Sequence, residues 1–361
     1  MIHPASRLEV VVHGRADGRS AVKTAAYCAR TSYWDARLGQ RFTERQRGGL
    51  LSHELVNWAS DAESLWNAAE KAETRINSRV VRELRPSLPA ELPLDQQVRL
   101  VRGYCLWLRD TYGVAVQANV HAPRFKDPEL EARLRADRSP GAEERYRQAL
   151  FDPEKTNLNF HAHILMTTRM VDRETGAFGD KTNDLDRKKT GPSEILKIRK
   201  VWETRTNAAL AQAGAERRVD LRSYRDMAKA RDAPEGLIAQ KHLGPAQAAR
   251  GRRFEVLEEA EFQGNIRLLA PHSRQAVRDK LRGADWDTSE AGVKREAIRR
   301  HNEDLWLDWI LRRARLREEA REVGQGFQEA LDREVARKRT VRPSAFEPPI
   351  PTWRLRRPSP T

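Results

Sequence analysis

The sequence has 361 residues, of which 39% are hydrophobic, so the chain can bury at least one sizeable core and is not disordered as a whole. Its 67 Lys and Arg residues stand against 52 Asp and Glu residues, and the resulting net charge of +15 favours polyanionic partners, nucleic acid first. No apolar run approaches the length of a membrane-spanning helix and the polar N-terminus lacks a secretory signal, so we expect a cytoplasmic protein without membrane insertion.

The cysteine content excludes two kinds of site. Cys28 and Cys105 are too few for a disulfide framework, and they lack the repeated spacing of a structural zinc site. Any metal must therefore be bound by histidines and carboxylates.

The first part of the chain predicts alternating strands and helices. In chain order they are a strand over Leu8–His13, a helix from Ala21, a helix from Ser60 to about Ile76, a strand over Arg79–Leu84 and a helix over Asp95–Thr111. Ser20 is a good N-cap for the first helix, Ser60 and Glu63 form a capping-box pattern, and Gly113 ends the last helix.

Two central strands are predicted next, over Val114–His121 and His161–Met170, because both segments are rich in apolar or β-branched residues. Between them lies a polar insertion over Pro123–Asn157 with a short helix near Glu143–Leu150. An amphipathic helix over Ser193–Gln212 follows a basic loop. We expect an α+β first domain over residues 1–212.

The remaining sequence becomes increasingly charged. We expect a basic extension over residues 213–272, charged helices over 273–341 and an extended or disordered proline-rich tail over 342–361. The C-terminal region as a whole is thus predicted to be mostly helical and basic. Trp306 and Trp309 fall on an Arg-rich helix, which would suit DNA retention, self-association or contact with another protein.

Three histidines fall on the two central strands. His161 and His163 are two residues apart, so the period of the pleat places both imidazoles on one face. His121 shares a face of the other strand with Asn119 and Gln117. If the strands pair, three imidazoles can converge on one cation; if they do not, His121 is a polar strand end and backbone carbonyls satisfy the other two.

Tyr27 follows Ala25 and Ala26 on the first helix, where small neighbours let a phenol stand at the rim of a site. A lone helical tyrosine more commonly packs in a core or an interface. Beside a divalent cation, however, a phenol can attack a phosphodiester and divide strand cleavage into two reversible transesterifications.

A series of segments resembles the MobA/MobL relaxases in the same order. They are GRSAVKTAAYCART, WASDAESLWNAAEKAE, VVRELRPSLP, VAVQANVH and NFHAHILMTTR with GAFGDK behind it, and the resemblance continues through VDLRSYRD and KHLGPAQAARGRRF to about Asn265. The chain departs from these relatives at Phe160, where they typically have proline, at Leu221, where histidine is common, and in its long 123–157 insertion.

The resemblance implies an antiparallel sheet flanked by helices, with a metal site of the HUH endonuclease kind. Tyr27 occupies the position of the nucleophile, and the positions of the metal ligands fall on His121, His161 and His163. Glu83 matches an acidic position near that site, although by itself it reads equally well as an exposed strand carboxylate.

The function implied by the resemblance is metal-dependent nicking of one DNA strand at a transfer origin during plasmid mobilisation. The implied product is a 5′-phosphotyrosine link that is later religated, and the implied cofactor is a divalent metal, Mn²⁺ or Mg²⁺. The expected partners are single-stranded DNA, relaxosome accessory proteins and a type IV secretion coupling protein.

Four basic residues lie close in sequence to the expected site and are candidate phosphate contacts. They are Arg19, Lys23, Arg30 and Arg47. Each one taken alone is more simply a solvated surface charge.

Two other functions stay open. A replication initiator or transposase of the same metal fold is disfavoured, because such proteins usually carry the tyrosine after the histidine pair. A non-catalytic, basic DNA-binding accessory protein would have structural histidines and a packed Tyr27. If a Tyr27→Phe variant still binds DNA but no longer nicks it, the protein is an enzyme and not such an accessory protein.

Overall fold

The computed structural model describes residues 3–44, 49–239 and 286–340 of the chain. It divides the chain into two compact units, Met1–Leu221 and Arg222–Thr361. Arg47, most of the predicted 213–272 extension and the 342–361 tail lie outside the described residues. The domain boundaries expected from the sequence stay predictions.

Unit 1 is built on an antiparallel sheet with the strand order β1-β5-β7-β6-β4, and β8 pairs with β7 beside this path. The strands are β1 (Leu8–Gly14), β4 (Leu50–Val56), β5 (Arg79–Pro86), β6 (Val114–His121), β7 (His161–Val171) and β8 (Phe178–Lys181). A separate hairpin joins β2 (Ser32–Asp35) to β3 (Gln40–Thr43). The predicted α+β class with an antiparallel sheet is confirmed.

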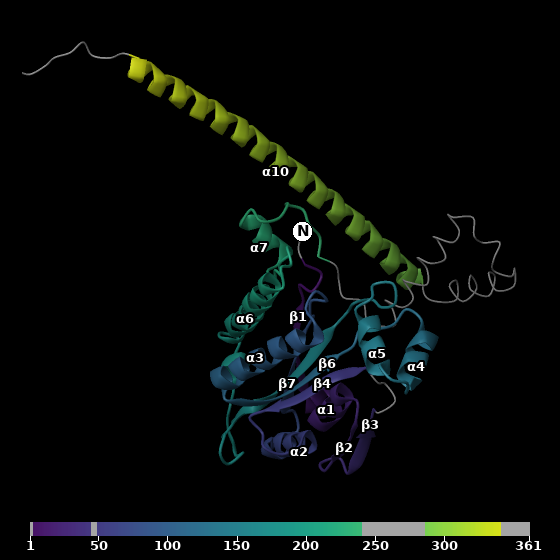
Figure 1. Cartoon of the computed structure of the whole chain (residues 1–361). Helices are drawn as coiled ribbons and strands as arrows, with labels where there is room; N and C mark the ends of the chain where they lie inside the picture. Colours follow the sequence, from purple (N-terminus) through teal and green to yellow (C-terminus); the bar gives the residue numbers. More distant parts are fainter. Residues whose placement is uncertain (1–2, 45–48, 240–285, 341–361) are drawn as a thin grey trace, which may run out of the picture. The chain divides into compact units, whose positions relative to one another are not determined.

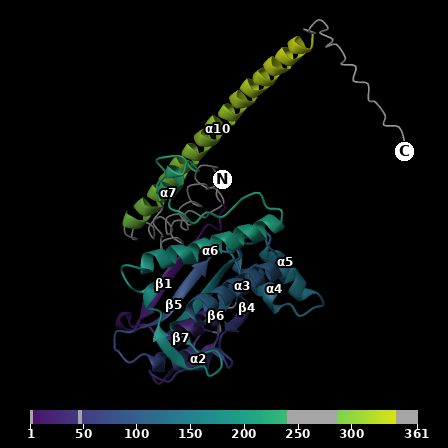
Figure 2. The ribbon, with the colours of Figure 1, turned by 90° about the vertical axis from the view of Figure 1, so that its left-hand side faces the viewer.

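Helices cover both faces of this sheet (Figure 1). The helices of unit 1 are α1 (Ala21–Ala29), α2 (Ala62–Ala72), α3 (Leu94–Tyr112), α4 (Pro128–Ala136), α5 (Ala142–Leu150) and α6 (Gly191–Gln212), with 3-10 turns η1 (Arg15–Asp17) and η3 (Asn183–Leu185). One apolar cluster joins α1 and α2 to Val81, Ala115 and Leu165 of the sheet. A second joins α3 and α6 to the opposite face, which carries Leu84 and Val116. Figure 2 shows α6 running across β1 and β5.

The predicted second helix is displaced at both ends. It begins after Asp61, whose carboxylate accepts a 2.7 Å hydrogen bond from the Ser64 amide, and not after Ser60. It ends at Ala72, short of Ile76, because Glu73 turns into extended backbone and its carboxylate binds Arg169 and Lys181 of the sheet. This long-range ion pairing outweighs local helix propensity.

The 123–157 insertion contains two helices, α4 and α5, where the sequence predicted one. Asp127 caps α4 and Pro128 follows at the first helical turn, which are both favourable helix-start residues. The rings of Phe151, at the end of α5, and Phe160, just before β7, stack with centroids 4.6 Å apart. Phe160 is fully buried, so this pair anchors the insertion to the sheet.

Unit 2 is mostly helical in its described part. It contains α7 (Tyr224–Lys229) and the 55-residue helix α10 (Trp286–Thr340), which confirms the prediction of long C-terminal helices. Trp306 and Trp309 meet edge to face on α10, with ring centroids 5.4 Å apart. Among the described helices of the whole chain, none is both long and apolar enough to cross a membrane.

Candidate metal and nucleophile site

The pairing of β6 with β7 brings the three histidines together. His121 lies directly opposite His161, and Asn119 lies opposite His163. Because alternate residues of a strand share a face, all three imidazoles project on the side of the sheet that carries α1. One ligand atom from each of His121, His161 and His163 lies within 4.8 Å of the other two. The strand pairing on which the convergence of the three histidines depends is thus present.

Each imidazole is oriented by a hydrogen bond from one ring nitrogen. Nε2 of His121 is 2.7 Å from the carbonyl oxygen of Cys28, Nδ1 of His161 is 2.9 Å from that of Asn159, and Nδ1 of His163 is 2.5 Å from Oε1 of Glu83. An N–H that donates to an oxygen leaves the other nitrogen with its lone pair exposed. The candidate ligand atoms are therefore the Nε2 atoms of His161 and His163 and Nδ1 of His121, and this last atom lies 3.3 Å from Nη2 of Arg30 in the structure.

The protonation of two of these rings also suits metal binding. Burial lowers the pKa of His121 from its ordinary value of 6.5 to about 3, and the neighbouring His163 adds to this effect. Burial lowers the pKa of His161 to about 4. Both rings are therefore neutral near pH 7, which is the form that donates a lone pair to a cation.

Glu83 of β5 is the anchor beneath this cluster. It is almost fully buried, and its carboxylate accepts hydrogen bonds from His163, from Nε2 of His13 at 2.7 Å and from Arg85 at 2.6 Å. Burial by itself raises the pKa of Glu83, but the hydrogen bonds from His13, His163 and Arg85 outweigh burial and hold the pKa far below its ordinary value. Glu83 is thus an ionised carboxylate inside the site and not an exposed one.

Tyr27 stands beside the cluster on α1. Its ring meets that of His163 edge to face, with centroids 6.2 Å apart, and the side chain is half-buried. The Arg30 guanidinium lies 4.7 Å above the Tyr27 ring, and its Nη2 is 3.3 Å from Nδ1 of His121. The tyrosine therefore lies at the rim of the histidine cluster, with a cation against its face.

Buried polar contacts at its first turn fix the helix that carries Tyr27. Glu70 of α2 accepts a 2.8 Å hydrogen bond from the amide of Ala21 and binds the guanidinium groups of Arg15 and Arg37. Ser20 caps the helix through the amide of Lys23. These contacts satisfy amides that the first turn of a helix leaves unpaired, and they tie α1 to α2.

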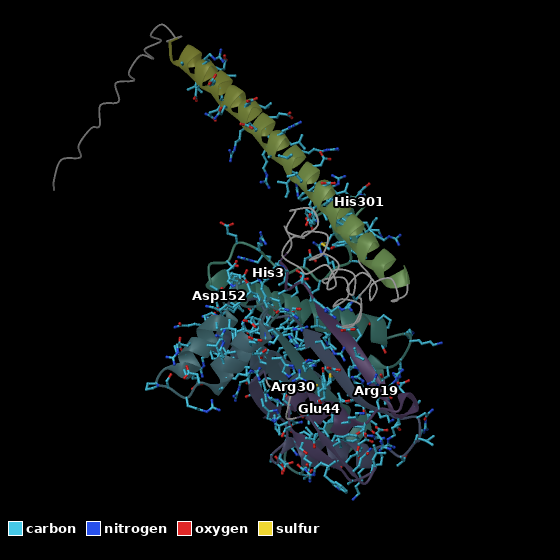
Figure 3. All side chains as sticks on the ribbon, turned by 90° about the vertical axis from the view of Figure 1, so that its right-hand side faces the viewer. His3, Arg19, Arg30, Glu44, Asp152 and His301 are labelled. Carbon is cyan, nitrogen blue, oxygen red and sulfur yellow. The ribbon has the colours of Figure 1, made fainter. Side chains whose placement is uncertain are left out.

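The predicted phosphate contacts are spread over α1. Arg19 is exposed just before the helix, and Arg30 follows its last turn (Figure 3). Lys23 is exposed and lies 5.3 Å above the ring of Phe42 in β3. Of the described candidates, only Arg30 contacts the histidine cluster.

Sequence reasoning missed several residues that support the site. His13 and Arg85 bind Glu83 from β1 and β5, and His53 of the unpredicted β4 is 2.9 Å from Oδ1 of Asn119. A period-two reading would have placed Arg85 on the same face as Glu83, because the two are two residues apart. The positions of His13 and His53 depend on long-range strand pairing, which has no local signal.

The donor set fits a divalent transition metal. Three imidazoles, each fixed by a hydrogen bond from its other nitrogen, form the arrangement common in protein metal sites. Imidazole nitrogen accepts several divalent transition metals, so the donor set by itself does not select one of them. The cluster could therefore hold one ion through His121, His161 and His163.

Comparisons with known proteins agree with the resemblance. The model of the MobA/MobL family matches residues 19–253, which is more than half of the chain. Mobilization protein MobL of Acidithiobacillus ferridurans is 35% identical over 252 residues, covering 66% of this chain and 61% of that protein. The chain thus spans about three fifths of the length of this curated relative.

Two solved structures are more distantly similar. One, described as the molecular basis of vancomycin resistance transfer in Staphylococcus aureus, aligns with a TM-score of 0.45 and 23% identity over 60% of this chain and 98% of that chain. The other is the conjugative relaxase TrwC in complex with oriT DNA in a metal-bound structure, with a TM-score of 0.30 and 13% identity over 84% of this chain and 98% of that chain.

Proposed function

The chain belongs to the MobA/MobL family, and from this membership we propose that it is a relaxase that nicks one DNA strand at a transfer origin and later rejoins it during conjugative mobilisation. The observation that supports this proposal best is the convergence of His121, His161 and His163 beside the ring of Tyr27. A nucleophile next to a metal-binding cluster is what phosphodiester transesterification requires.

In this proposal, His121, His161 and His163 hold the divalent ion. When bound there, the ion would polarise the scissile phosphate and stabilise the negative charge that develops on its oxygens. Glu83 keeps His163 oriented from beneath, and the carbonyl groups of Cys28 and Asn159 do the same for the other two rings.

Tyr27 supplies the attacking oxygen. Its phenolic oxygen forms a bond to phosphorus, the bond from phosphorus to the 3′-oxygen breaks, and the proton lost by the phenol is balanced by the proton gained by the departing 3′-oxygen. The products are a 5′-phosphotyrosine link and a free 3′-hydroxyl. Attack by a 3′-hydroxyl on the same link reverses the reaction and rejoins the strand.

The single strand is held by the basic surface around the site. Arg30 lies against both Tyr27 and His121, where a guanidinium can meet a phosphate oxygen. Arg19, just before α1, and Lys23, in its first turn, offer further exposed charges. Relaxosome accessory proteins and a type IV secretion coupling protein complete the proposed partners.

A cleavage assay tests the proposal. Labelled single-stranded DNA that carries the encoding element's transfer origin is incubated with Mn²⁺ or with EDTA, and the products are separated on a denaturing gel. The wild type and a Tyr33→Phe control, altered on the neighbouring strand β2, should cleave only with the metal, whereas Tyr27→Phe should bind the DNA without cleaving it. Tight binding without cleavage by the wild type, with any divalent metal, would favour the non-catalytic accessory protein.

A further inference from the structure

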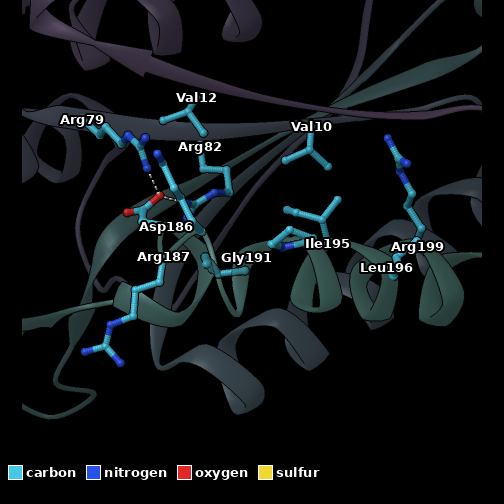
Figure 4. Close-up of a pocket in the computed structure, with 13 residues that line it drawn as sticks. Val10, Val12, Arg79, Arg82, Asp186, Arg187, Gly191, Ile195, Leu196 and Arg199 are labelled. Atoms are coloured by element: carbon cyan, nitrogen blue, oxygen red, sulfur yellow. Dashed lines mark hydrogen bonds and ion pairs between the residues drawn. The ribbon is translucent and has the colours of Figure 1, made fainter.

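A cavity lies on the face of the sheet opposite the histidines. Side chains alternate along a strand, so Glu83 of β5 points toward the histidines while Arg82 points to the side covered by α6. Val10 and Val12 of β1 share that side, since Val12 lies opposite Arg82 and Val10 opposite Leu84. The start of α6 and the loop before it complete the walls (Figure 4).

The cavity is strongly basic. Five basic side chains line it, with one carboxylate among them: Arg79, Arg82, Arg187, Lys188 and Arg199, against Asp186. A single oxygen of Asp186 accepts from both Arg79 and Arg82, at 2.5 Å each, as the dashed lines in Figure 4 show. Arg187 is also 3.4 Å from Asp184 outside the cavity. One shared carboxylate cannot neutralise this set, so the walls keep an excess of positive charge.

Arg82 supplies the second observation. Its side chain is fully buried, and its Nε and Nη1 atoms have no hydrogen-bond partner among the described residues. The Nε atom of Arg199 is likewise buried without a partner among them. Burial lowers the pKa of the Arg82 guanidinium in spite of the pairing with Asp186. Buried donors without acceptors are costly, and an anion in the cavity would satisfy them.

The shape of the cavity indicates the size of the anion. Its volume is about 620 Å³, which is within the range of small-molecule sites and much larger than a bare phosphate needs. The apolar part of the lining comes from Val10, Val12, Leu185, Pro192, Ile195 and Leu196. The first turn of the 22-residue helix α6 also faces the cavity, with Gly191 and Pro192 in the lining, and helix N-termini favour anions.

We propose that this cavity binds the phosphate of a nucleotide-sized phosphate ester, away from the histidine cluster. The guanidinium groups of Arg82 and Arg199 contact the phosphate oxygens, while the valine and isoleucine side chains pack against the sugar. The phosphate belongs either to the backbone of a bound DNA strand or to a free nucleotide, and both present the same chemistry.

Calorimetry on the full chain in EDTA tests this site without any cleavage, so the result does not depend on the proposed relaxase reaction. The probes are deoxyadenosine 5′-monophosphate, an octathymidylate strand and inorganic phosphate as a competitor. The variant is Arg187→Ala with Arg199→Ala, which leaves the buried Arg82 in place, and the control is Arg173→Ala with Arg217→Ala, an equal loss of charge from exposed positions.

The expected result is that at least one of the two probes binds about tenfold or more weakly to the cavity variant and changes less than about twofold in the control. If the cavity variant binds only the mononucleotide more weakly, the ligand is a free nucleotide. A loss for the octathymidylate, with a shallower dependence of its affinity on salt, identifies a strand phosphate. If both probes bind the cavity variant as tightly as the control, or phosphate competes with neither, the proposal is wrong.

Discussion

Glu83 connects the histidine cluster to the rest of the sheet. Its two carboxylate oxygens are shared among His163, His13 and Arg85, which come from three strands, β7, β1 and β5. Only an ionised carboxylate can accept all of these hydrogen bonds, and its lowered pKa ensures that form. Glu83 is therefore expected to act through His163 as a positioning residue.

Replacing Glu83 by Gln tests this role. The amide keeps the volume of the side chain but replaces one accepting oxygen by a donating NH₂ group, so the hydrogen bond that orients His163 is weakened. We therefore expect Mn²⁺ affinity to fall by about 10- to 100-fold. Calorimetric titration of Mn²⁺ measures the change. Glu54→Gln, on the opposite face in an ion pair with Arg102, is the control. Equal Mn²⁺ affinity in E83Q and wild type would show that Glu83 is not needed to orient the ligand.

The histidine pKa values predict a pH dependence of stability. The pKa is about 3 for His121 and about 4 for His161 in the folded chain, below the ordinary value of 6.5, so the unfolded chain binds protons that the native chain does not. The stability that these two neutral rings contribute is fully present above pH 6.5. It is lost progressively as the pH falls toward 4 for His161 and toward 3 for His121.

Urea unfolding of the full chain in EDTA, at pH 7.5 and pH 5, checks this sign. The free energy of unfolding of the wild type should be smaller at pH 5 than at pH 7.5. This decrease should be smaller in a His161→Gln variant, which lacks one of the two rings. If the unfolding free energy of the wild type is unchanged or larger at pH 5, or falls no more than that of the Gln variant, the imidazoles are not buried in the neutral form.

At the scale of single residues, the sequence predicted those site residues whose common face follows from their spacing along a strand. His161 and His163 follow from the pleat, and His121 follows once two apolar strands are assumed to be neighbours. The burial of Glu83 and its contact with His13 could not be predicted, because they depend on the register of β1 against β5, which pairs Val11 with Glu83.

The helix α1 shows how an element places its residues in the site. Arg30 ends this helix in the left-handed backbone region, with φ of 51°, where glycine is the usual residue. That conformation turns the chain away after Tyr27 and brings the guanidinium back over the phenol. A strained cap that carries a functional side chain is typical of active sites.

Replacing Arg30 by Gly should therefore separate stability from activity. Glycine adopts the left-handed conformation without steric cost, so we expect the unfolding free energy to stay equal or rise by up to about 1 kcal/mol. Loss of the guanidinium should slow origin cleavage by about 10- to 100-fold. Denaturant unfolding and single-turnover cleavage measure the two effects, with Arg173→Ala as the control. Wild-type cleavage by R30G would remove Arg30 from the mechanism.

The elements that the sequence predicted are those with strong periodic patterns. Strands β1, β5, β6 and β7 have long apolar or alternating runs, and α3 ends at a glycine with φ of 66°. The missed strands β2, β3 and β8 are only four residues long, and β4 mixes Ser, His and Glu into an edge position. Strands of this kind form because a neighbour offers hydrogen bonds, which is a tertiary effect.

Phe160 packs against the end of the long insertion. The buried ring of Phe160 stacks on that of Phe151 at the end of α5. This aromatic pair anchors the insertion where it rejoins the sheet. Nothing in the local sequence pairs these two rings, because their contact depends on how α5 packs against the start of β7.

At the scale of the whole molecule, the proposed chemistry resides in one unit. Every described candidate residue, from Arg19 to His163, belongs to Met1–Leu221, as does the basic cavity beneath α6. The family match continues to residue 253, past the end of this unit. The long helix α10 is rich in Arg and Glu residues, and its described part also exposes large apolar side chains, among them Leu307, Leu316 and Phe327. Such a surface suits association or DNA retention better than catalysis.

A chain of residues 1–221 is therefore expected to fold and to cleave origin DNA in Mn²⁺. Compact units with their own core usually fold alone, so unfolding should remain cooperative. The rate of cleavage at saturating DNA should stay within about threefold of the full chain, while the affinity for DNA falls as basic residues are lost. Cooperative folding without cleavage would place an essential residue in the second unit.

The most direct test of the central claim identifies the residue that is linked to DNA. After reaction with origin DNA in Mn²⁺, digestion with nuclease and trypsin releases the peptide Thr24–Arg30, because Lys23 and Arg30 are the flanking cleavage sites. Mass spectrometry should find a nucleotide 5′-phosphate on Tyr27 in this peptide, and none in EDTA. A link on another residue, such as Tyr33 in the next tryptic peptide, or cleavage without any covalent link, would contradict the account.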